Sequence, residues 1–127
     1  MAAPDRTVVW FEELERRAVP RVGGKNASLG EMVRHLGARG VAVPPGFATT
    51  AEAYWRFVDA NGLRKTIAAA LGELAAGKAT LAETGQSLRR AFLRGDWPAE
   101  MTEAIAHAYR SLCERIGRAG ADVAVRS

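Results

Sequence analysis

The chain has 127 residues, which is enough for one domain with a single hydrophobic core. Its hydrophobic fraction of 48% and charged fraction of 25% are ordinary for a globular protein, and no apolar run reaches the roughly 18 residues that a membrane span needs. The net charge of +4 comes from arginines and lysines scattered along the chain, so we expect neither a nucleic-acid nor a membrane partner. The single cysteine, Cys113, cannot form an internal disulfide, which favours a reducing, cytoplasmic compartment.

The first half of the chain predicts two extended segments with a helix between them. The β-branched and aromatic run "TVVWF", residues 7–11, is typical of a strand. Residues 41–50 cannot be helical, because two adjacent prolines push this segment into extended geometry. Between them, a helix that ends at Gly37 or Gly40 is indicated by apolar residues at helical spacing. These residues are Leu29, Met32, Val33 and Leu36.

The second half predicts four helices. Thr49 and Glu52 form a capping-box pattern, so a helix is expected to begin near residue 50 and to end at Asn61. Two further helices are expected over residues 63–74 and 81–92. The last helix is expected to open at "DWPAEM", with Asp96 or Trp97 at the cap and Pro98 in the first turn, and it carries a stripe of six apolar residues. These are Met101, Ile105, Ala108, Tyr109, Leu112 and Ile116.

The last residues, "DVAVRS", alternate in polarity and predict a strand that runs to the end of the chain. Such a strand needs more sheet than the preceding sequence offers. We therefore expect a mostly helical α+β fold with a few short strands, truncated at residue 127.

The stretch "VGGKNASLGEM", residues 22–32, predicts a phosphate site. Gly23 and Gly24 allow ligand oxygens to approach the backbone, and the helix that follows would present free N–H groups. Lys25, one of only three lysines, would add a mobile positive charge. The spacing matches neither a Walker A loop nor a Gly-x-Gly-x-x-Gly fingerprint. The alternative is a solvated lysine at an ordinary helix start.

Few other residues suggest chemistry. Arg126 stands at the end of the predicted strand, where a buried guanidinium would need an anion such as phosphate; the alternative is a solvated terminus. His35 and His107 lack neighbouring ligands, and Cys113 is expected to pack beside a buried leucine, so no metal site is predicted. No catalytic residue is indicated.

Three stretches together carry a resemblance to a known family. "VGGKNASLGEM", "VAVPPGFATTAEAY" and "ADVAVRS", in this order and at these distances, resemble the N-terminal nucleotide-binding region of the phosphoenolpyruvate synthase (pyruvate, water dikinase) family. That family is related to pyruvate, phosphate dikinase. The similarity covers essentially the whole chain. It implies that residues 1–127 are the N-terminal part of an ATP-grasp-type AMP/ATP-binding domain.

The resemblance also implies an activity that this chain would share in. In the family, ATP phosphorylates a histidine on a separate swivelling domain, and the phosphohistidine converts pyruvate to phosphoenolpyruvate, with AMP and phosphate as the other products. By position, Lys25 and Arg126 correspond to family residues on the ATP phosphates. The swivelling domain, the pyruvate-binding barrel and the Mg²⁺ ligands would lie outside this sequence, so we expect the isolated chain to be inactive.

Two other interpretations stay open. The chain could be a fragment of a related rifamycin phosphotransferase, because nothing in it identifies the phosphate acceptor. It could also be a stand-alone, non-catalytic module that binds a nucleotide or a protein, with "DVAVRS" pairing to a partner's sheet. The oligomeric state is not predicted.

Overall fold

The computed structural model describes residues 6–127, which form two compact units. The sheet unit contains the chain up to Tyr54 together with Ala99–Ser127, and the hairpin unit contains Trp55–Pro98. Helix α3 (Ala51–Ala60) begins in the sheet unit and ends in the hairpin unit. The fold class is α+β, as expected: most of the described chain is helical, with one two-stranded sheet.

The sheet confirms both predicted extended segments. Strand β1 (Val8–Trp10) pairs antiparallel with β2 (Phe47–Thr49), and Val9 lies opposite Ala48. The sheet's inner face packs on a small core that also includes Leu14, Val22 and Ala27.

Several short helices precede the predicted first helix. These are the 3₁₀ turns η1 (Phe11–Glu13) and η2 (Arg16–Ala18) and the single turn α1 (Val19–Val22). Helix α2 (Gly24–Gly37) ends where expected, and it begins one residue before Lys25, close to the helix start predicted after the two glycines.

The predicted cap of α3 is wrong by one residue. Thr49 belongs to β2, and its neighbour Thr50 caps the helix by accepting a hydrogen bond from the N–H of Ala53 (3.2 Å). The Thr50 hydroxyl also donates to the carbonyl oxygen of Arg6 (2.6 Å), which ties the start of α3 to β1. Glu52 pairs with Arg21 (3.3 Å) instead of completing a capping box.

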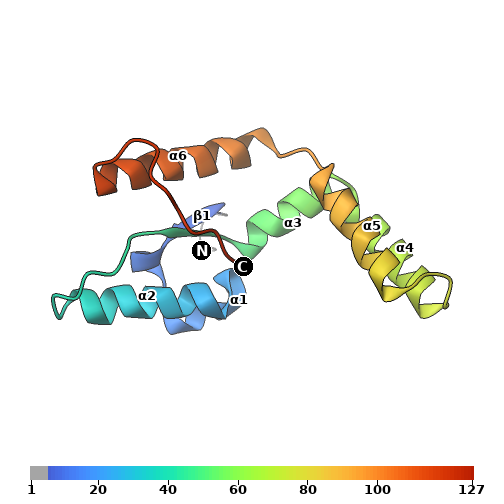
Figure 1. Cartoon of the computed structure of the whole chain (residues 1–127), viewed down its shortest axis with the longest axis horizontal. Coiled ribbons are helices and arrows are strands. Elements are labelled where there is room, and N and C mark those ends of the chain that lie inside the picture. The colour runs from blue at the N-terminus through green and yellow to red at the C-terminus, as the bar shows by residue number, and fades with distance from the viewer. Residues whose placement is uncertain (1–5) are drawn as a thin grey trace, which may run out of the picture. The chain divides into compact units, whose positions relative to one another are not determined.

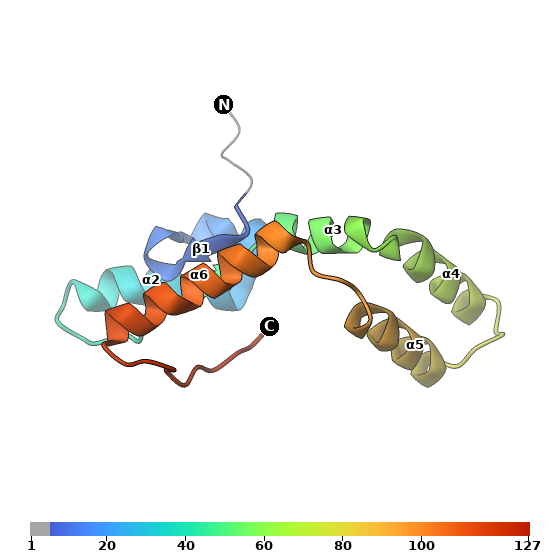
Figure 2. The same ribbon diagram turned by 90° about the horizontal axis from the view of Figure 1, so that it is seen from above.

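Helix α6 (Ala99–Ile116) packs against β1, as Figures 1 and 2 show. Of its predicted stripe, Met101, Ala108 and Leu112 are buried, whereas Ile116 is 46% exposed. Near the end of the helix, the Arg115 guanidinium lies 3.7 Å from the centre of the Trp10 ring and 2.6 Å from a Glu12 carboxylate oxygen. These two contacts fix α6 along the strand.

The hairpin unit confirms two more predicted helices. Helices α4 (Leu63–Ala75) and α5 (Leu81–Leu93) lie side by side (Figure 2). Asn61 closes the unit at its other end: its side-chain amide donates to the carbonyl oxygens of Phe57 (2.9 Å) and Asp96 (3.0 Å) and accepts from the N–H of Asp96 (2.8 Å).

A capping box at the start of α5 predicts a measurable effect on stability. The Thr80 hydroxyl accepts from the N–H of Glu83 (3.1 Å), and the Glu83 carboxylate accepts from the N–H of Thr80 (2.8 Å). Replacing Thr80 by alanine removes the first bond and should lower the free energy of unfolding by about 1 kcal/mol. Thr66→Ala, an exposed change within α4, is the matched control for urea unfolding followed by circular dichroism. Equal midpoints for the two variants would contradict the capping role.

The predicted C-terminal strand is wrong. Residues 118–127 contain no strand, and Val125 is 91% exposed. An alternating sequence forms a strand only where a neighbouring strand supplies backbone partners, and within the described chain β1 and β2 pair only with each other. The segment is anchored instead by the hydroxyl of Tyr109, which donates to the carbonyl oxygen of Ala121 (2.8 Å).

Candidate functional site

The N-terminal end of α2 has an open backbone. Gly23 turns the chain with φ +83°, a conformation that favours glycine, whereas Gly24 is already the first helical residue. Of the two glycines, only Gly23 therefore forms the turn. Carbon β atoms built on either glycine would meet nothing within 4 Å, so space beside both residues is open to a ligand.

The first turn of α2 also has free hydrogen-bond donors. Within residues 6–127 no side chain caps this helix. The first bond back to the turn is donated by the N–H of Ala27 to the carbonyl oxygen of Gly23 (3.1 Å). The preceding amides of the first turn therefore have no acceptor within the helix, and they carry its partial positive charge. This end of the helix suits an anion.

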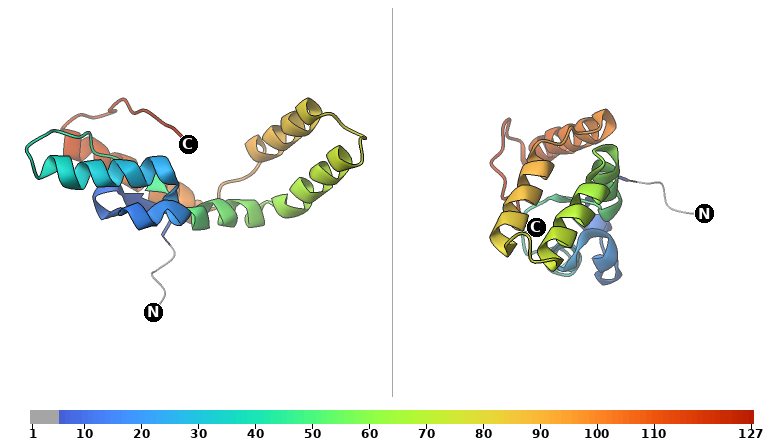
Figure 3. Two further views of the ribbon diagram at one scale, coloured as in Figure 1. Left: turned by 90° about the horizontal axis from the view of Figure 1, so that it is seen from below. Right: turned by 90° about the vertical axis from the view of Figure 1, so that its right-hand side faces the viewer.

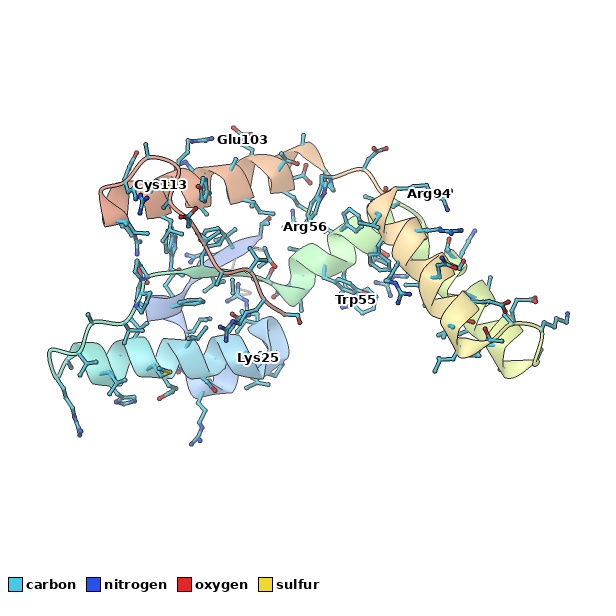
Figure 4. The ribbon with its side chains drawn as sticks, viewed as in Figure 1. Lys25, Trp55, Arg56, Arg94, Glu103 and Cys113 are labelled. Carbon is cyan, nitrogen blue, oxygen red and sulfur yellow. The ribbon has the colours of Figure 1, made fainter. Side chains whose placement is uncertain are left out.

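Lys25 lies in this first turn, at the end of α2 that Figure 4 labels. Its side chain is exposed, and none of the carboxylates of residues 6–127 pairs with it. The next residue, Asn26, donates from its side-chain amide to the carbonyl oxygen of Val22 (2.8 Å), which links the helix start to α1. Lys25 thus adds an unpaired full charge to an already positive helix end.

A hollow of about 380 Å³ lies along the N-terminal half of α2. Its lining consists of Arg16, Val19, Gly24, Ala27, Ser28 and Glu31. The backbone N–H of Arg16 donates to the Glu31 carboxylate (2.9 Å), which also contacts the His35 ring (2.9 Å). These contacts, the backbone bond first, hold the pKa of Glu31 below its usual value. The lining of the hollow therefore contains one carboxylate, from Glu31, and one guanidinium, from Arg16.

Arg126 is exposed, so the expectation of a buried guanidinium on a strand is wrong. The chain nevertheless brings this residue back toward α2. Two views agree that the end of the chain, one residue after Arg126, lies beside the start of α2 (Figures 1 and 3). Lys25 and the C-terminal segment therefore lie on the same side of the sheet unit.

The remaining candidates do not form a metal or catalytic centre. His35 is exposed and pairs with Glu31, and His107 is exposed on α6. In the part of the chain that the structure describes, no three His, Cys, Asp or Glu side chains are grouped so as to hold a metal ion. None of the helices in residues 6–127 has the length and apolarity to cross a bilayer.

One polar contact of the C-terminal segment has no signal in the sequence. Tyr109 belongs to the predicted buried stripe of α6, and it is half-buried. Its hydroxyl, however, reaches the carbonyl oxygen of Ala121 across 12 positions of sequence. No spacing rule connects a helical tyrosine to an irregular segment after two glycine turns, so the sequence carries no signal for this bond.

Comparison with known proteins identifies the kind of domain. Residues 19–127 match the family profile described as pyruvate phosphate dikinase, AMP/ATP-binding domain. The match includes every predicted site residue: Gly23, Gly24, Lys25 and Arg126.

Individual relatives agree with this match. The chain is 47% identical over 124 residues to the phosphoenolpyruvate synthase of Neisseria meningitidis. The aligned region covers 97% of this chain and 16% of that protein. It is 45% identical over 125 residues to the phosphoenolpyruvate synthase of Synechocystis, with coverages of 94% and 15%. For the Escherichia coli phosphoenolpyruvate synthase, the identity is 42% over 106 residues, with coverages of 83% and 13%. The chain thus spans about a sixth of the length of these relatives.

Proposed function

Because the chain belongs to the family of pyruvate phosphate dikinase AMP/ATP-binding domains, we propose that it binds the phosphates of ATP at the N-terminal end of α2. The observation that carries the proposal is the open, uncapped first turn of this helix, with an exposed and unpaired lysine. The family match supplies the ligand, and the helix end supplies the chemistry that the ligand's phosphates require.

Each residue has a distinct part in this proposal. Gly23 and Gly24 leave room for phosphate oxygens close to the backbone, where the amides of the first turn can donate to them. The Lys25 ammonium is a point charge on a flexible stem and can follow a phosphate. Arg126 would close the site from the C-terminal segment, with a planar guanidinium that matches two phosphate oxygens.

For the whole protein, we propose the activity that the names of its relatives indicate, phosphoenolpyruvate synthesis. It would convert ATP, pyruvate and water to AMP, phosphoenolpyruvate and phosphate in the cytoplasm, with a phosphohistidine as intermediate. In this proposal the present chain is the N-terminal part of an ATP-grasp-type domain. Residues 6–127 contain no group fit to hold Mg²⁺, so the metal would be held by other residues. Because the relatives are named as phosphoenolpyruvate synthases, we favour pyruvate over rifamycin as the phosphate acceptor.

Removing the Lys25 charge tests the proposed site. We expect Lys25→Ala to weaken ATP binding at least about tenfold, because hydrogen bonds to charged groups contribute about 1.5–3 kcal/mol. Calorimetric titration of the full chain with ATP and with AMP, both in the presence of Mg²⁺, measures the effect. AMP binding should change less if Lys25 contacts the terminal phosphates.

Lys65→Ala is the matched control, because Lys65 is an exposed lysine on α4 in the other unit. It should leave ATP affinity unchanged. Equal affinities of the two variants, or no ATP binding by the unmodified chain, would overturn the proposed site.

A further inference from the structure

The chain reverses direction after α6 and is fixed again at one point. Gly117 and Gly120, with φ of +74° and +63°, turn the chain back on itself. Between them, the N–H of Arg118 donates to the carbonyl oxygen of Cys113 (3.0 Å) and closes the helix end. Ala121, which follows this turn, is buried beside α6 with an exposed fraction of only 5%. Its carbonyl oxygen accepts the hydrogen bond from the Tyr109 hydroxyl (2.8 Å).

Beyond this anchor, the segment has little other support. Residues 122–127 are all exposed and contain no regular structure. From Ala121 the segment, red in Figures 1 and 3, runs toward the start of α2. Arg126 is five residues from the anchor, so it cannot move further than about 18 Å from Ala121.

The surroundings of Tyr109 keep its hydroxyl protonated. The neighbouring Cys113 side chain, one turn further along α6, raises the pKa of Tyr109 above its ordinary value. Burial contributes in the same direction. A protonated phenol can donate to a carbonyl oxygen, whereas a phenolate cannot. The anchor is therefore intact at neutral pH.

We propose that Tyr109 is a positioning residue for nucleotide binding, which holds Arg126 near the start of α2 by fixing Ala121. Tyr109 acts through Arg126 and does not itself contact the nucleotide. This inference rests on the proposed phosphate site, in which Arg126 supplies one of the charges.

Tether length sets the size of the effect. With the anchor, five residues separate Arg126 from the last fixed point; without it, the last fixed point is Arg118, eight residues away. The effective concentration of a tethered group falls roughly as the −3/2 power of tether length, which predicts a loss of about twofold. Loss of the hydrogen bond that orders the segment adds to this effect, so the upper limit of the expected loss in ATP affinity is about tenfold.

The test is Tyr109→Phe, which removes the hydroxyl and keeps the ring. We expect ATP affinity of the full chain, measured by calorimetry with Mg²⁺, to fall about two- to tenfold. Tyr54→Phe makes the same chemical change at the only other tyrosine, which is 46% exposed, and should leave affinity unchanged. Thermal unfolding of both variants verifies that the fold is retained. If Tyr109→Phe does not fold, two glycines inserted after Asp122, beyond the anchor, lengthen the tether to Arg126 instead and should also weaken ATP binding; unchanged affinity of that variant overturns the inference.

Double-mutant cycles separate positioning from a general structural role. In an Arg126→Ala background, Tyr109→Phe should cause no further loss, because its effect passes through the missing guanidinium. In a Lys25→Ala background, its effect should be retained in full. The inference is overturned if the effects of Tyr109→Phe and Arg126→Ala on ATP affinity are fully additive, or if Tyr109→Phe leaves the affinity unchanged. If Lys25→Ala still weakens ATP binding in that case, the proposed phosphate site remains supported. Absence of Lys25-dependent binding overturns both.

Discussion

Replacing Gly30 by alanine is expected to lower the free energy of unfolding by about 2 to 3 kcal/mol. Gly30 is buried in the middle of α2, where the helix crosses η1. A β carbon built on it would lie 2.5 Å from the β carbon of Leu14 and 3.0 Å from the carbonyl oxygens of Leu14 and Phe11. These neighbours are backbone or next to backbone, so no side-chain rotation relieves the clash.

Gly37→Ala is the control for this substitution. Gly37 ends the same helix, and a β carbon there would meet nothing within 4 Å. We expect its unfolding free energy to stay within about 0.5 kcal/mol of the original. Urea unfolding of both variants measures the difference. Similar midpoints would show that α2 does not pack against η1 as closely as described.

Replacing Met101 by alanine is expected to cost about 3 kcal/mol of stability. Met101 is 2% exposed and is among the largest fully buried side chains of the described chain. It lies in the first turn of α6, which packs against β1. Truncation removes the buried methylene and thioether groups and leaves a cavity that the surrounding backbone can fill only in part.

Met32→Ala tests whether this loss reflects burial. Met32 is 45% exposed on α2, so the same chemical change there should cost less than about 1 kcal/mol. Thermal unfolding, followed by circular dichroism, ranks the two variants. If Met32→Ala proved the more damaging, the burial of Met101 at the start of α6 would be wrong.

The Gly30 contact also matters for the proposed site. Lys25 and the open first turn are positioned only as firmly as α2 itself, and Gly30 lets this helix lie directly on the backbone of η1. Packing in the middle of the helix therefore sets where its N-terminal end points.

Much of the secondary structure follows from the sequence alone. The boundaries of α4, α5 and α6 lie close to those that the 3.6-residue spacing of apolar residues predicts, because a helix that buries one face must repeat at that period. Pro44 and Pro45 exclude a helix before β2 for an equally local reason. The three motif stretches, taken in order, also sufficed to indicate the family that the profile match identifies.

Only the tertiary structure decided the features that depend on partners distant in sequence. "DVAVRS" has the alternation of a strand, but no strand pairs with it in the described chain, so it stays irregular. Thr50 rather than Thr49 caps α3, because Thr49 is held in the sheet and Thr50 bonds to Arg6, 44 residues away. The bond between Tyr109 and Ala121, 12 residues apart, anchors the segment that leads back toward α2. Local pattern specifies which conformations a segment can adopt, whereas hydrogen-bond partners from elsewhere in the fold select among them.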